Sequence, residues 1–105
     1  MRKASVLLYG IKAGVLEELE EGARFTYAPE WLAAPGAVPV SSTLPLRPEP
    51  FEVRRGVHPF FENMLPEGWL LNLSLRSLHM SADDVFGMVL AFCRDCIGAV
   101  QVVPE

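Results

Sequence analysis

Short strand-forming runs separated by glycine-bearing turns open the chain and constrain its fold more than any other feature. The runs cover residues 5–9, 14–19 and 24–27, and Gly10 and Gly22 stand in the turns between them. Runs this short, joined by connections this tight, pair with their sequence neighbours in opposite directions. The sequence therefore predicts an antiparallel meander of three strands.

A fourth strand is predicted over residues 38–46. Val40, Leu44 and Leu46 share one parity there, which is the period of side chains along a strand, and the prolines of the segment occupy the other parity. Proline cannot donate to a strand ladder, so this strand is expected at a sheet edge. The charged, proline-bearing segment 47–56 that follows is expected to be an exposed loop.

Helices are predicted mainly in the second half of the chain. Apart from one helical turn that begins at Pro29, they are a short helix over 58–65, a helix over 69–79 and a last helix with Ser81 as its N-cap. A final strand is expected over 99–103. The prediction is a single α+β domain over residues 1–105, in which a small antiparallel sheet packs against these helices.

Composition excludes several classes of function. Nine lysines and arginines against thirteen aspartates and glutamates give a net charge of -4, which repels nucleic-acid backbones. No apolar run approaches the roughly 20 residues of a membrane span, and the opening segment is too short for a signal peptide. We therefore expect a cytoplasmic protein that binds neither nucleic acid nor membrane. Half of the residues are apolar, which leaves apolar side chains for a partner surface.

Cys93 and Cys96 form the one pattern that could carry chemistry by itself, as a redox pair or as half of a zinc site. The pair lies at the end of a predicted helix, where the helix dipole favours the neutral thiol and opposes redox work. A zinc site would need His58 and His79, and neither has ligand-like spacing. The alternative, which we favour, is that both cysteines are reduced, partly buried small hydrophobic residues.

Catalytic motifs are missing from the sequence. It has no nucleophile elbow, no glycine-rich phosphate loop, no Walker lysine, no His-Arg-Asp catalytic loop and no Asp-Phe-Gly motif. Nothing in the chain would hold ATP or Mg²⁺. We therefore expect neither enzymatic activity nor a cofactor or metal.

Five short motifs follow one another along the chain. They are Val6-Leu7-Leu8-Tyr9-Gly10, Phe25-Thr26-Tyr27 with Pro29 and Trp31-Leu32, Ser41 with Leu44-Pro45-Leu46, Phe60-Phe61-Glu62-Asn63 with Leu65-Pro66-Glu67-Gly68, and Arg94-Asp95 with Gly98-Ala99. In this order they resemble the N-terminal subdomain of HipA-type serine/threonine kinases. The kinase core normally follows this subdomain and packs on it. Here no kinase core follows, so the resemblance implies a kinase partner rather than a kinase.

Free-standing versions of this subdomain are similar to the HipS antitoxin of HipBST-type toxin–antitoxin systems. The resemblance then implies a non-catalytic protein that binds a HipT-like kinase and suppresses its phosphorylation of a tryptophanyl-tRNA synthetase. A HipB-like DNA-binding protein would complete a ternary complex. The alternative is an accessory subunit that completes or activates a split HipA-type kinase.

Trp69 departs from the fused kinases, which commonly carry a polar or basic residue at this position. Because tryptophan is over-represented among residues that dominate binding energy, we expect Trp69 to contact the kinase. The neighbouring residues expected to shape this contact are Phe60, Phe61, Glu62, Pro66 and Glu67. The alternative, that Trp69 fills the domain's own core, stays open at this point.

Overall fold

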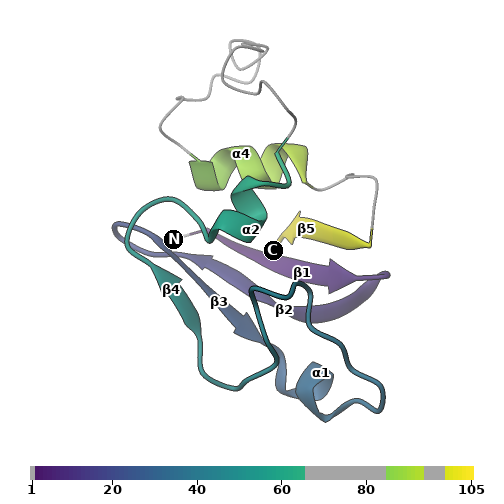
Figure 1. The fold of residues 1–105 in the computed structure, drawn as a ribbon. Helices are drawn as coiled ribbons and strands as arrows, with labels where there is room; N and C mark the ends of the chain where they lie inside the picture. Colours follow the sequence, from purple (N-terminus) through teal and green to yellow (C-terminus); the bar gives the residue numbers. More distant parts are fainter. Residues whose placement is uncertain (1, 66–84, 94–98) are drawn as a thin grey trace.

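The computed structural model describes residues 2–65, 85–93 and 99–105, and a five-stranded antiparallel sheet forms its centre (Figure 1). The strands are β1 (Lys3–Leu8), β2 (Ile11–Glu18), β3 (Ala23–Tyr27), β4 (Phe51–Val53) and β5 (Val100–Pro104). Their spatial order is β4-β3-β2-β1-β5, and each neighbouring pair is antiparallel. The predicted α+β fold, with an N-terminal meander and a C-terminal strand, is confirmed.

The turn between β1 and β2 contains only Tyr9 and Gly10. Both residues have positive φ angles, 52° and 79°, which is the signature of the hairpin turn whose twist matches that of the flanking strands. Glycine adopts this conformation without a steric cost. The turn therefore fixes the β1–β2 register directly from the sequence.

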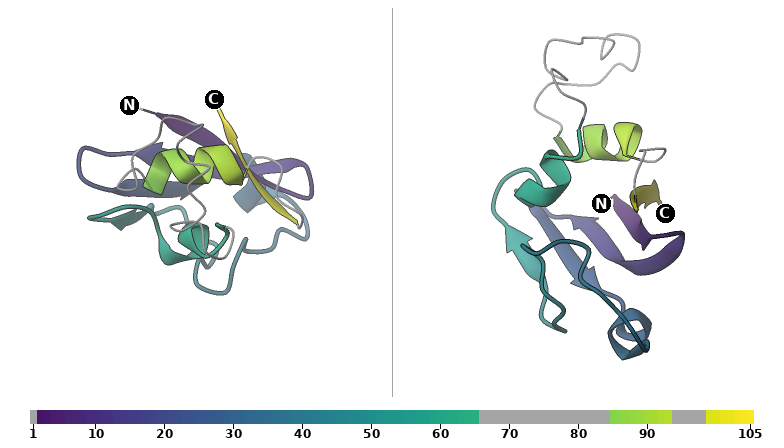
Figure 2. Two further views of the ribbon diagram at one scale, coloured as in Figure 1. Left: turned by 90° about the horizontal axis from the view of Figure 1, so that it is seen from above. Right: turned by 45° about the vertical axis from the view of Figure 1, so that its right-hand side comes forward.

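Three helices are described: α1 (Pro29–Ala33), α2 (Pro59–Glu62) and α4 (Val85–Phe92). Proline opens both α1 and α2, where its missing N–H costs no hydrogen bond. α2 and α4 lie on the same face of the sheet (Figures 1 and 2). α2 packs toward β3, and α4 is joined to β5 by the Val102 N–H, which donates to the Cys93 carbonyl over 3.0 Å. None of the described helices has the length and apolar character to cross a membrane.

The hydrophobic core lies between this face of the sheet and the two helices. Alternate strand residues point into it, as the two-residue period of a strand requires. Its fully or almost fully buried members include Val6, Leu16, Phe25, Tyr27, Phe61, Met88, Val89 and Val102. Among the described residues the buried side chains are all of the hydrophobic class, with the Tyr27 hydroxyl as a polar group among them, so this side of the domain is stabilised mainly by apolar burial.

The predicted strand over 38–46 was wrong. Only a single bridge, between Ser41 and Leu44, forms in this segment, which otherwise runs as a loop. Val40 and Leu44 are buried because the Tyr27 side chain holds them: its hydroxyl accepts from the Val40 N–H over 3.0 Å and donates to the Leu44 carbonyl. The apolar spacing therefore reflects a loop folded onto the core.

The edge strand lies instead at β4, inside the segment predicted to be an exposed loop. β4 pairs with β3 through Ala23–Val53, Arg24–Glu52 and Phe25–Phe51. Arg47 folds the preceding turn: its guanidinium lies 3.8 Å from the centre of the Phe51 ring and donates to the Pro50 carbonyl over 3.2 Å. The charged residues that suggested a loop thus hold a short strand in place.

Candidate partner interface

α2 presents the part of the predicted contact surface that the structure describes. The helix begins after His58, whose Nδ1 accepts a hydrogen bond from the Phe60 N–H over 3.1 Å and so caps the helix. Burial lowers the pKa of His58 from its ordinary value of 6.5. The lowered pKa favours the neutral imidazole, which is the form whose Nδ1 can accept this bond.

The three predicted contact residues on α2 have different environments. Phe61 is fully buried, with its ring centre 5.6 Å from that of Phe25. Phe60 is half-buried and packs edge-on against Phe61 at 5.2 Å, and Glu62 is exposed. Phe60 and Glu62 are therefore the two that a partner can reach, with Phe61 supporting them from below. The predicted contacts Pro66, Glu67 and Trp69 lie outside the described residues.

The cysteine pattern is described only at Cys93. This residue directly follows α4, as the predicted helix end requires, and its side chain is fully buried in the core. His58, one of the two histidines that a zinc site would need, serves as the cap of α2. Cys96 and His79 lie outside the described residues. Cys93 thus has the environment of the small hydrophobic residue that we predicted.

The opposite face of the sheet carries a row of charges that the sequence analysis did not single out. Glu52, Arg24, Glu17, Lys3 and Glu105 lie in register on neighbouring strands, with signs that alternate across all five. Arg24 pairs with Glu52 at 2.9 Å, and Lys3 pairs with Glu17 at 3.7 Å. Opposite charges directly across a sheet are stabilising, so the row reinforces the strand order.

A β-bulge brings one further cation onto this face. The β1–β2 register shifts between Val6 and Leu7, so that Ala13 and Gly14 are both buried and Lys12 stands opposite Leu7. Lys12 then reaches Glu105 over 3.2 Å. Alternate positions of β1 and β2 that carry charge could have revealed this face. The bulge at Ala13, which turns Lys12 onto the face, could not have been predicted from the alternation of residues.

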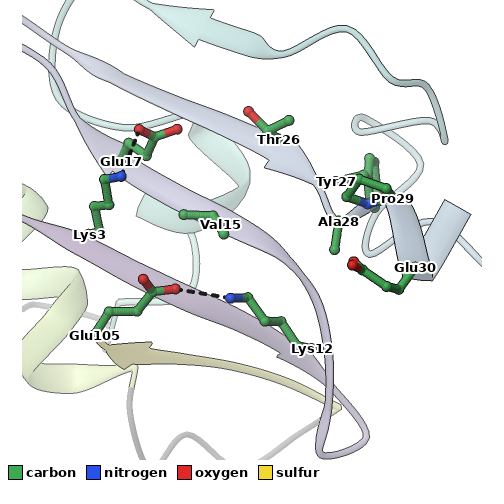
Figure 3. A pocket seen from close by; sticks show the side chains of 10 residues that line it. All are labelled: Lys3, Lys12, Val15, Glu17, Thr26, Tyr27, Ala28, Pro29, Glu30 and Glu105. Atoms are coloured by element: carbon green, nitrogen blue, oxygen red, sulfur yellow. Dashed lines mark hydrogen bonds and ion pairs between the residues drawn. The ribbon is translucent and has the colours of Figure 1, made fainter.

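A cavity of about 660 Å³ lies on this face (Figure 3). Its lining residues are Lys3, Lys12, Val15, Glu17, Thr26, Tyr27, Ala28, Pro29, Glu30 and Glu105. The pKa of Glu105 is lowered mainly by the hydrogen bond from the Ser5 hydroxyl, 2.8 Å long, and by the bond from Lys12. The cavity therefore combines charged walls with the apolar floor that Val15 provides.

A second cavity, of about 300 Å³, adjoins the first. It shares Lys12 and Glu30 with it and is otherwise lined by Ile11, Trp31, Ala34, Pro35, Gly36 and Ala37. The Trp31 indole donates to the Val38 carbonyl over 3.0 Å, which fixes the ring against the loop that follows α1. Lys12 and Glu30 therefore stand between a cavity with charged walls and a neighbouring cavity whose other lining residues are uncharged.

Comparisons with known proteins agree with the fold. The family model described as the HipA N-terminal domain matches residues 4–103. A solved structure described as the N-terminal domain of HipA toxin has a TM-score of 0.77 and 30% identity, and the match covers 100% of this chain and 93% of that one.

Two curated relatives differ greatly in length. An uncharacterized protein of Haemophilus influenzae is 30% identical over 105 residues, which is 100% of this chain and 94% of that protein. A protein of Sinorhizobium fredii described as putative kinase Y4mE is 36% identical over 81 residues, which is 77% of this chain. The match spans only 19% of that putative kinase.

Proposed function

The chain belongs to the HipA N-terminal domain family, and from that premise we propose that it is an antitoxin that binds a HipA-family serine/threonine kinase and inhibits it by direct contact. The observation that carries the proposal is the match of nearly the whole chain to this domain, which is non-catalytic. The family model matches residues 4–103 to this domain, and the function that we propose for the domain is binding.

The relatives support a kinase as the partner. In the Sinorhizobium protein the matched region is 19% of a much longer chain named as a putative kinase. The Haemophilus relative carries the same region in a protein of about this length. The same domain thus occurs within a putative kinase in one relative and in a short protein in another. We infer that it has a surface that can bind the rest of such a kinase.

The contact that we propose centres on α2 and on the residues that follow it in sequence. Exposed Glu62 and half-buried Phe60 both belong to this helix. Trp69, together with Pro66 and Glu67, would supply the dominant contact, because a buried tryptophan typically contributes more binding energy than its neighbours. The net charge of -4 makes a third, DNA-binding protein the component that would contact DNA. The complex would form in the cytoplasm.

The decisive test is kinase activity during a titration. A purified HipA-family kinase that lacks this domain would phosphorylate tryptophanyl-tRNA synthetase while this protein is added up to and beyond an equimolar amount. We expect phosphorylation to fall to background near equimolar. A rise would instead identify an accessory subunit that completes the kinase, and no change without co-purification would overturn the proposed partnership.

Trp69→Ala separates a contact role from a core role. If Trp69 contacts the kinase, the variant keeps the far-ultraviolet circular dichroism and unfolding midpoint of the wild type but no longer inhibits. If the variant unfolds, Trp69 belongs to the core. Glu62→Arg is the companion variant, since the exposed Glu62 side chain can be replaced at little cost to folding.

A further inference from the structure

The two adjoining cavities on the open face of the sheet, called here the open-face groove, have an unbalanced charge. Two lysines, Lys3 and Lys12, face three glutamates, Glu17, Glu30 and Glu105, so the formal charge of the lining is one negative. Lys3 pairs with Glu17 and Lys12 pairs with Glu105. The Glu30 side chain makes no ion pair or hydrogen bond with any residue that the structure describes, and its carboxylate points back toward the strands (Figure 3).

Apolar surface lies directly beside this carboxylate. Val15 forms the floor of the charged end, and Ile11, which is 61% exposed, borders the apolar end together with Trp31. Tyr9, 78% exposed, lies in the adjoining turn. Large apolar side chains with this much solvent exposure, at one end of a groove, indicate a surface that another molecule covers.

We propose that the open-face groove binds an exposed segment of a partner protein through an arginine followed by an apolar residue. The planar guanidinium matches the Glu30 carboxylate in a bidentate geometry, and its three-carbon stem can lie along Val15. The apolar residue occupies the end bordered by Ile11 and Trp31. An anion is disfavoured because both lysines already have carboxylate partners.

A metal ion is a poorer occupant of the same groove. Within the described residues no three histidine, cysteine, aspartate or glutamate side chains lie close enough together to hold one. A single free carboxylate beside an apolar floor suits a long organic cation better than a small one. The groove also lies on the opposite face of the sheet from α2, so the inference does not depend on the proposed kinase contact.

The test is a titration of the isotope-labelled full chain with a capped Arg-Leu dipeptide, followed by nuclear magnetic resonance. We expect concentration-dependent shifts of the Val15, Thr26 and Lys12 amides and of the Trp31 indole N–H. The capped citrulline-Leu dipeptide, which has the same shape without the charge, is expected to bind more weakly by a factor of about five or more.

Matched variants locate the interaction. Glu30→Gln removes the free charge and is expected to raise the Kd for the arginine dipeptide by about fivefold, whereas Glu49→Gln, an exposed carboxylate outside the groove, leaves it unchanged. Equal binding of the arginine and citrulline dipeptides would overturn the proposal. So would shifts confined to α2, or no shifts at dipeptide concentrations up to about 10 mM.

Discussion

The Tyr27 hydroxyl joins the sheet to the loop over 38–46. It accepts from the Val40 N–H and donates to the Leu44 carbonyl, and both of these residues are buried. Tyr27→Phe leaves a buried donor and a buried acceptor without partners. We expect the free energy of unfolding to fall by about 2–3 kcal/mol, measured by urea denaturation.

Tyr9→Phe is the matched control for this variant. The Tyr9 side chain is 78% exposed, so removal of its hydroxyl should change stability by less than about 0.5 kcal/mol. Equal stabilities of the two phenylalanine variants would mean that water replaces the Tyr27 hydroxyl, and the loop would then be held by apolar contacts alone.

Gly22 is required where the chain passes β4. A Cβ atom at this position would lie 1.9 Å from the Val53 carbonyl oxygen and 2.8 Å from the Arg54 carbonyl carbon. Both are backbone atoms, which cannot rotate away. We expect Gly22→Ala to destabilise the domain by about 1–3 kcal/mol and to speed hydrogen exchange in β3 and β4.

Gly10→Ala distinguishes this clash from a general effect of losing a glycine. Its Cβ would meet open space, so the expected cost is only the conformational one of a positive φ angle, about 1–2 kcal/mol. Exchange rates in β3 and β4 should not change selectively. If both variants increase exchange in the same strands, the contact with Val53 is not the cause.

At the scale of elements, the cap of α2 makes stability depend on pH. Burial lowers the pKa of His58 below 6.5, so between the folded and unfolded pKa values the unfolded chain binds the additional proton. The contribution of His58 is therefore full above about pH 6.5 and is lost as pH falls through the folded pKa. Protonation also removes the Nδ1 lone pair that caps Phe60.

We expect Tm to fall between about pH 7 and about pH 5, and we expect this fall to be smaller in His58→Asn. Asparagine retains an oxygen that can accept the Phe60 N–H but does not titrate. Thermal denaturation of both proteins across this range checks the prediction. The same pH dependence in the variant would assign the fall to other groups.

The sequence predicted the elements whose signals are local. The strands of the meander, the proline-initiated α1 and α2 and the strand after Cys93 each depend on a turn residue, a proline or a short apolar run. The segment 38–46 is a loop where a strand was predicted, and the segment 47–56 contains β4 where a loop was predicted. Both differences depend on contacts with residues distant in sequence. Tyr27 holds the first segment from 13 residues away, and β3 pairs with the second. Neither contact can be predicted from the residues nearby in sequence.

The candidate site likewise has one part that the sequence predicted and one part that it did not. The motif around Phe60 and Glu62 could be found because its residues are contiguous, and Phe61 was grouped with them because sequence does not say which side of a short helix faces the core. The open-face groove joins β1, β2, α1 and the last residue of the chain. Alternating charges along β1 and β2 could have revealed the face, but the groove itself forms only when these elements are brought together by the folded sheet.

For the whole molecule, the two proposed binding surfaces lie on opposite faces of one sheet and should act independently. α2 lies on the covered face, and the open-face groove lies on the other. Sites couple only when each biases an element that has two arrangements, and the strands between these surfaces are continuously paired from β4 to β5. Single substitutions in surfaces this separate should therefore have additive effects.

Two single variants and the double variant test this independence. Glu62→Arg should raise the concentration of this protein needed to inhibit the kinase while leaving the Kd for the Arg-Leu dipeptide unchanged. Glu30→Gln should raise the Kd for the Arg-Leu dipeptide and leave kinase inhibition unchanged. The double variant should show both effects, each at the size seen in the single variant. If Glu30→Gln also reduced kinase inhibition, the groove would be part of the kinase contact, and the arginine that it binds should then be sought on the kinase itself.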